Sequence, residues 1–158
     1  MSHQFKPWQK SPQAAAIYYA NLGLEIFPCS AAKVPLINAW QKAATTNLEI
    51  IVSWWRQFPF ADVAWSLPAS VAVIDVDVKH GKHGFRDFEA LTGVGTDKFP
   101  TPSASSPSGG VHLFCSTGGK KYLNAVPIAG TGVDLKTRVG FVVLPGAGNG
   151  RRWIPGKP

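Results

Sequence analysis

The sequence predicts an α+β fold in one compact domain, and three observations support this prediction. The chain has 158 residues, 45% of them hydrophobic, which is enough for one core and too little for two ordinary domains. Helix patterns are found at residues 12–22 and 46–58, whereas strand patterns dominate residues 71–144. The 16 glycines and 13 prolines favour a loop-rich fold over a helical bundle or a coiled coil.

The chain is expected to begin with a helix and a strand. Ser11 and Pro12 are typical of a helix start, and the apolar run over residues 14–22 ends at Gly23, a good helix stop. Residues 24–28 then have the composition of a short strand.

A second helix is predicted before Pro59. Thr46 and Glu49 have the spacing of a capping box, which marks a helix start. The following apolar residues fall on one helical face: Leu48, Ile51, Trp54 and Trp55. We expect the two tryptophans in the core.

Residues 71–78 are the clearest strand, because they are rich in β-branched residues and alternate with period two. Asp75 and Asp77 project from the same face, about 6.5 Å apart along the chain. Two such carboxylates repel each other, and a hard divalent cation between them removes the repulsion. The pattern therefore predicts a metal site, although glycosyltransferases, nucleases and plain surfaces also contain Asp-x-Asp.

The rest of the chain predicts a short helix and three strands. Phe85, Phe88 and Leu91 indicate a helix that ends at Gly93. A Pro/Ser-rich stretch follows over residues 100–108. The three strands are expected at residues 111–116, 132–136 and 140–144.

A glycine-containing turn at Ser108, Gly109 and Gly110 leads into the strand that carries His112. The backbone N–H groups of such a turn could hold an anion, and His112 could donate a hydrogen bond to a triphosphate. The turn is not a Walker A loop, because no Gly-Lys-Ser/Thr follows. An ordinary hairpin turn with a structural histidine is the alternative.

A third carboxylate is found in the strand at residues 132–136. Asp134 and Lys136 share one face, and Val133 and Leu135 share the other. If this strand neighbours residues 71–78, Asp134 completes an ion site, and Lys136 is available for a phosphate. A surface aspartate beside a lysine is the alternative for this segment alone.

The formal charge is +7, and all of it arises from residues after Val78. A polyanionic partner explains this asymmetry, and so does a basic surface kept for solubility. We expect five basic residues to contact a nucleic-acid backbone, and Lys33 to contact a nucleotide; the five are Lys120, Lys121, Arg138, Arg151 and Arg152.

The setting of the chain is expected to be reducing and cytoplasmic. Cys29 and Cys115 have no second pair beside them, so neither a zinc ribbon nor a disulfide framework is predicted. No apolar stretch approaches the length of a membrane span, and the first eleven residues lack a signal-peptide core. An intracellular protein without a membrane partner fits these features.

In the order of these motifs, the chain resembles the N-terminal domain of bifunctional DNA primase/polymerases, in the archaeo-eukaryotic primase superfamily. Asp75-Val76-Asp77 resembles the first acidic motif of that family. The segment from Ser108 to His112 resembles its nucleotide-binding Ser/His motif, and Asp134 its third acid. The resemblance covers residues 14–154.

The resemblance implies a fold and a division of the chain. An RRM-like antiparallel palm sheet would carry the acidic site, packed with helices beside a smaller N-terminal α/β unit. The whole chain, residues 1–158, would be one catalytic domain. Residues 1–10 would be flexible, residues 11–70 would form the α/β portion, and residues 71–158 the palm-like portion.

The resemblance also implies a metal-dependent nucleotidyl transferase that joins nucleoside triphosphates on a single-stranded or primed DNA template by a two-metal mechanism. Asp75, Asp77 and Asp134 would bind Mg²⁺ or Mn²⁺, with His112 as a further catalytic residue. A helicase, in the same longer chain or separate, is a further expected partner. Two alternatives remain open: a single-strand binding module without polymerase activity, and a metal-dependent phosphodiesterase or nuclease.

Overall fold

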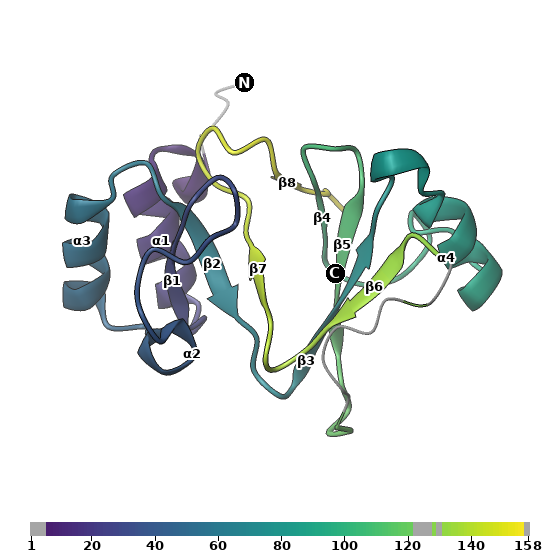
Figure 1. Cartoon of the computed structure of the whole chain (residues 1–158), viewed down its shortest axis with the longest axis horizontal. Coiled ribbons are helices and arrows are strands. Elements are labelled where there is room, and N and C mark those ends of the chain that lie inside the picture. The colour runs from purple at the N-terminus through teal and green to yellow at the C-terminus, as the bar shows by residue number, and fades with distance from the viewer. Residues whose placement is uncertain (1–5, 122–127, 129–130, 157–158) are drawn as a thin grey trace. The chain divides into compact units, whose positions relative to one another are not determined.

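The structure is a computed structural model that describes residues 6–121, 128 and 131–156. The chain divides into two compact units. The first consists of Met1–Ser66 and Phe141–Gly150, and the second of Leu67–Gly140 and Arg151–Pro158. Each unit contains one antiparallel sheet with helices packed on it, so the predicted α+β class is confirmed (Figure 1). The described part contains four α-helices and sheets of three and five strands.

The first unit begins with a 3-10 helix, η1 (Pro7–Gln9), and helix α1 (Pro12–Asn21). Ser11 caps α1, since its Oγ accepts a hydrogen bond from the Ala14 N–H at 3.0 Å, so the predicted start is confirmed. A four-residue helix, α2 (Trp40–Ala43), follows later. Among the described helices, the longest of which has ten residues, none has the length and apolar character needed to cross a bilayer.

Helix α3 (Leu48–Gln57) is present, but its predicted cap needs correction. Asn47, not Thr46, caps it: the Asn47 Oδ1 accepts hydrogen bonds from the backbone of Glu49 and Ile50. Because the helix starts after Asn47, Leu48 lies in its first turn, where its side chain is 40% exposed. Trp55 is buried as expected.

The first unit contains a three-stranded sheet in the order β1-β2-β7. The strands are β1 (Ile26–Cys29), β2 (Asp62–Ser66) and β7 (Phe141–Val143). Ser66, the last residue of β2, lies opposite Phe141, the first residue of β7. The second unit is therefore inserted between two strands that are direct neighbours. Strand β2 was not predicted, and β1 starts two residues later than expected.

The five-stranded sheet of the second unit has the order β6-β3-β5-β4-β8, with every pair antiparallel. Its strands are β3 (Val71–Val76), β4 (Ser103–Ser105), β5 (Val111–Ser116), β6 (Val133–Lys136) and β8 (Arg152–Trp153). Strand β5 has its predicted bounds. Strand β3 stops at Val76, so Asp77 follows the strand rather than lying within it. Strands β4 and β8 were not predicted.

Helix α4 (Gly84–Thr92) packs against one face of this sheet and ends at Gly93, as predicted (Figure 1). Gly93 has φ 79°, a left-handed conformation that suits glycine. Phe88 of α4 forms a core cluster with sheet residues on that face: Val76, Val111, Leu113 and Val133. Because side chains alternate along a strand, Asp75 lies on the opposite face of the sheet from α4.

Candidate active site

Three predicted site residues meet on one row of the five-stranded sheet. In the antiparallel register, Asp75 of β3 lies directly opposite Asp134 of β6 on one side and His112 of β5 on the other. Directly opposed residues share a face of the sheet, with Cβ atoms about 5 Å apart. The register therefore brings together residues that are up to 59 positions apart in the sequence.

The Asp75 carboxylate has two partners on this face. His112 Nε2 lies 3.3 Å from Asp75 Oδ1, and Lys136 Nζ lies 3.0 Å from Asp75 Oδ2. The Asp75 side chain is 19% exposed and the His112 side chain 5%, so both are largely shielded from water. Lys136 follows Asp134 by two residues on β6, which explains why it reaches the same carboxylate.

The surroundings of Asp75 and His112 determine the charge that each side chain carries. Burial by itself raises the pKa of Asp75, but the hydrogen bond and charge from His112 and the nearby Lys136 outweigh burial, so the pKa lies well below its ordinary value. Burial lowers the pKa of the His112 imidazole, and the positive charges of Lys136 and Arg151 add to this effect against the opposing influence of Asp75. At neutral pH we therefore take Asp75 as ionised and His112 as a neutral donor through Nε2–H.

Asp77 has a separate set of partners just beyond the end of β3. Its Oδ1 accepts a hydrogen bond from the Lys79 N–H at 3.0 Å, and its Oδ2 lies 3.3 Å from Lys82 Nζ. Burial opposes ionisation of Asp77, yet these two partners hold its pKa below the ordinary value. The Asp77 main chain continues the ladder toward β6, because its N–H donates to the Gly132 carbonyl at 2.7 Å.

The donor chemistry of the three acids fits a hard divalent cation, since all three offer carboxylate oxygens and two of them are directly opposed like charges. In the part of the chain that the structure describes, however, no three His, Cys, Asp or Glu side chains are grouped so that they could hold a metal ion. Lysine ammonium groups instead contact Asp75 and Asp77. Binding of an ion would therefore require Lys136 and Lys82 to move away from these carboxylates.

The predicted Ser/Gly turn lies beside the end of β3 and connects β4 with β5. The Gly109 N–H donates to the Ser106 carbonyl at 3.1 Å, so the turn itself uses one of the donors predicted to hold an anion. The Ser108 hydroxyl lies 3.0 Å from the Ser106 hydroxyl. Gly110 approaches the Val76 carbonyl so closely that a Cβ atom at this position would collide with it. The turn thus lies next to the first acidic motif.

The predicted basic contacts fall into three groups. Lys120, Lys121 and Arg138 line one pocket of the second unit. Arg152 is exposed on the edge strand β8. Arg151 directly precedes this strand, and its positive charge lowers the pKa of His112. Lys33 belongs to the first unit, where it follows β1 in a turn with φ 60°.

The contact of Lys82 with Asp77 was not predicted from the sequence. A lysine five residues after an aspartate carries no signal by itself. The nearby Gly81 could have indicated it, because Gly81 has φ 76° and a chain that turns at this glycine can return toward Asp77.

A comparison with protein families matches residues 16–158 to the family described as "Prim-Pol: Bifunctional DNA primase/polymerase, N-terminal". The match includes every residue of the two acidic segments and of the Ser/His turn. No curated protein matches the chain.

Proposed function

Because this chain belongs to the family of bifunctional DNA primase/polymerase N-terminal domains, we propose that its five-stranded sheet carries a metal-dependent nucleotidyl transferase site built on Asp75, Asp77 and Asp134. Membership makes the chain a primase/polymerase catalytic domain with a DNA template and nucleotides as its substrates. The proposal adds the ligands and the roles of residues. The observation that carries it is the row on which Asp134, Asp75 and His112 are direct neighbours.

In this proposal the three aspartates hold Mg²⁺ or Mn²⁺. When bound, such ions lower the pKa of an attacking hydroxyl and neutralise a leaving pyrophosphate. Asp75 is suited to this role because its depressed pKa keeps it ionised. Asp134 supplies a second carboxylate at the same level of the sheet.

His112 and Lys136 bind the triphosphate of the incoming nucleotide in this proposal. The neutral His112 donates one hydrogen bond through Nε2, now directed at Asp75. Lys136, once released from Asp75, places a positive charge beside the phosphates. The turn at Ser108, Gly109 and Gly110 lies beside β3, the strand of Asp75. The nucleotide contact of Lys33 stays a prediction. A primer 3′-hydroxyl or an initiating nucleotide then attacks the α-phosphate in line.

We also infer the finer architecture from the family. The antiparallel order β6-β3-β5-β4-β8 with α4 on one face is consistent with an RRM-like palm. The three-stranded unit is consistent with the smaller α/β portion of one catalytic domain. A helicase partner and a cytoplasmic setting stay predictions.

The test is primer extension by the purified chain on a primed single-stranded template, with labelled nucleoside triphosphates and Mg²⁺ or Mn²⁺. We expect extension that requires the metal, with at least a hundredfold loss in the Asp75→Asn/Asp77→Asn variant. Glu89→Gln is the matched control, because Glu89 is an exposed acid of the same unit. Strand binding without extension would support the binding module instead, and degradation of the strand would support a phosphodiesterase.

A further inference from the structure

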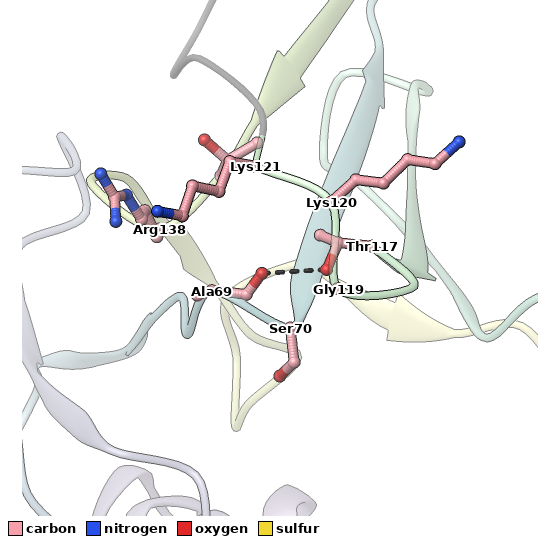
Figure 2. A pocket seen from close by; sticks show the side chains of 8 residues that line it. Ala69, Ser70, Thr117, Gly119, Lys120, Lys121 and Arg138 are labelled. Atoms are coloured by element: carbon pink, nitrogen blue, oxygen red, sulfur yellow. Dashed lines mark hydrogen bonds between the residues drawn. The ribbon is translucent and has the colours of Figure 1, made fainter.

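A basic pocket lies at the end of the five-stranded sheet where β3 begins and β5 and β6 end (Figure 2). Its volume is about 300 Å³. The residues that line it include Ser70, Thr117, Gly119, Lys120, Lys121 and Arg138.

Hydrogen bonds between neighbouring segments hold the floor of this pocket in place. The Thr117 hydroxyl donates to the Ala69 carbonyl at 3.0 Å, and the Thr117 N–H donates to the Ser70 carbonyl at 2.9 Å. The chain after β5 can turn there because Gly118 and Gly119 both have positive φ angles. Hydrogen-bonded backbone at the ends of these strands therefore forms part of the pocket.

The pocket has an excess of positive charge. All three charged residues that line it are cations, and none of them forms an ion pair with a carboxylate among residues 6–121, 128 and 131–156. Figure 2 shows the Lys121 side chain extending toward Arg138, whereas Lys120 extends away from both. Lys121 and Arg138 thus converge, and a guanidinium beside an ammonium is well suited to a phosphate group.

The acidic row is the row of Asp134, Asp75 and His112 on the sheet. Its distance from the pocket indicates which backbone phosphate of a nucleic-acid strand the pocket can bind. Ser70 directly precedes β3 and lies five residues before Asp75, which corresponds to about 16 Å of extended chain. A stacked nucleic-acid strand advances about 3.4 Å per nucleotide, so about five nucleotides cover this distance.

We propose that Lys121 and Arg138 hold a backbone phosphate of a nucleic-acid strand about five nucleotides from the reacting end. The inference rests on the proposed function, because the acidic row defines where the reacting end lies. It adds a length requirement: a strand must be long enough to reach both places before the pocket contributes to its binding.

The test is fluorescence anisotropy with labelled oligodeoxyadenylates, which stack as single strands, of about three to about twelve nucleotides, without metal or nucleoside triphosphate. In the Lys121→Ala/Arg138→Ala variant, we expect the affinity for the longest strands to fall about tenfold and the affinity for the shortest to stay unchanged. The slope of log affinity against log salt should become shallower by about 0.7 for the long strands, because one phosphate contact is lost.

The matched control is Lys98→Ala/Arg56→Ala, which removes one lysine and one arginine from exposed positions outside the pocket. An equal loss in this control, an equal loss for all strand lengths, or no loss would overturn the proposal. A loss of affinity for free deoxythymidine triphosphate, with the long strands unaffected, would also overturn it, because the pocket would then bind the nucleotide.

The two proposals can fail separately. Binding is measured without catalysis, so a chain that shows the length effect but no metal-dependent extension would contradict the proposed function alone. If extension requires Asp75, but the Lys121→Ala/Arg138→Ala substitution changes the affinity equally for all strand lengths, only the proposal for the pocket is contradicted.

Discussion

At the scale of single residues, the site is a set of carboxylates whose charges lysines already balance. Asp75 contacts Lys136, and Asp77 contacts Lys82. Directly opposed carboxylates such as Asp75 and Asp134 destabilise a sheet unless a cation is near. The lysines therefore stabilise the ion-free sheet, and under the proposed function they would compete with a metal ion for the same oxygens.

This competition predicts the effect of Lys82→Met on metal binding. The pair with Asp77 is exposed to solvent, and such pairs contribute only about 0.2 to 1 kcal/mol, so the affinity for Mn²⁺ should rise up to about fivefold. Isothermal titration calorimetry measures this change. Lys98→Met changes the net charge equally at an exposed position and should leave the affinity nearly unaltered. An unchanged or weaker affinity in Lys82→Met would contradict the competition.

The sequence was sufficient to identify Asp75, Asp134 and His112 as candidates, but it could not show that they are neighbours. Adjacency depends on the register between strands that are distant in the chain, and a shift of one residue would turn Asp134 to the other face. The partners of the acids were equally hidden. Which lysine reaches which carboxylate depends on the path of the loop after Asp77, and local patterns do not encode that path.

At the scale of elements, strong local signals were predictable and paired strands were not. Helices α1 and α4 have clear starts or stops, and β5 is a mainly apolar segment that directly follows a Ser-Gly-Gly turn. Strand β4 consists of Ser-Ala-Ser, which has little strand propensity of its own. It is extended because it pairs with β5 and β8, so only tertiary structure could reveal it.

The cap of α3 offers a direct test of the corrected helix start. Asn47→Ala should lower the free energy of unfolding by about 1 kcal/mol, because two backbone N–H groups lose their acceptor. Thr46→Ala should cost less, since Thr46 does not cap the helix. Urea denaturation followed by circular dichroism measures both values. A larger loss for Thr46→Ala would restore the original prediction.

The close approach of α4 to the backbone at Asp77, just after β3, requires glycine at position 132. A Cβ atom there would lie 2.6 Å from the Asp77 carbonyl oxygen and 2.8 Å from the Gly84 Cα. Gly132→Ala should therefore lower the free energy of unfolding by about 1–3 kcal/mol and reduce extension activity, because backbone must shift around Asp77.

Gly146→Ala is the control for this substitution, since the nearest atom to its added Cβ would be the Asn149 Nδ2 at 3.4 Å. Chemical denaturation of both variants gives the comparison. Equal stability of the two variants would show that the sheet accommodates the extra methyl group at Gly132 without strain.

At the scale of the whole molecule, the positive charge is concentrated in the second unit. That unit has eleven Lys and Arg against six Asp and Glu, a net charge of +5, whereas the first unit has a net charge of +2. The acids that are proposed to bind metal thus belong to the more basic unit. The positive electrostatic potential of this unit attracts a polyanionic strand, although the carboxylates of the site are locally negative.

The insertion of the second unit predicts that the first can fold alone. Because Ser66 and Phe141 are paired, an Asn-Gly turn can join residues 6–66 directly to residues 141–150 as a hairpin. We expect this joined chain to unfold cooperatively on heating, as followed by circular dichroism.

The control for the joined chain is one that stops at Ser66. It lacks β7 and also lacks the Pro145 carbonyl, which accepts a hydrogen bond from the Tyr19 hydroxyl at 2.6 Å. We expect no cooperative transition from it. Gradual melting of the joined chain would show that the first unit depends on the second for its stability.

The same pairing of Ser66 with Phe141 determines the order of events on the ribosome. The first sheet lacks its third strand until the inserted segment Leu67–Gly140 has been synthesised, so one edge of β2 stays open for 74 residues of elongation. The Leu67 N–H bonds to the Gly140 carbonyl at 3.1 Å, so folding of the inserted unit brings its two ends together. Folding of the later unit thereby lowers the entropic cost of completing the earlier one, and a nascent chain that pauses before β7 exposes a strand edge prone to aggregation.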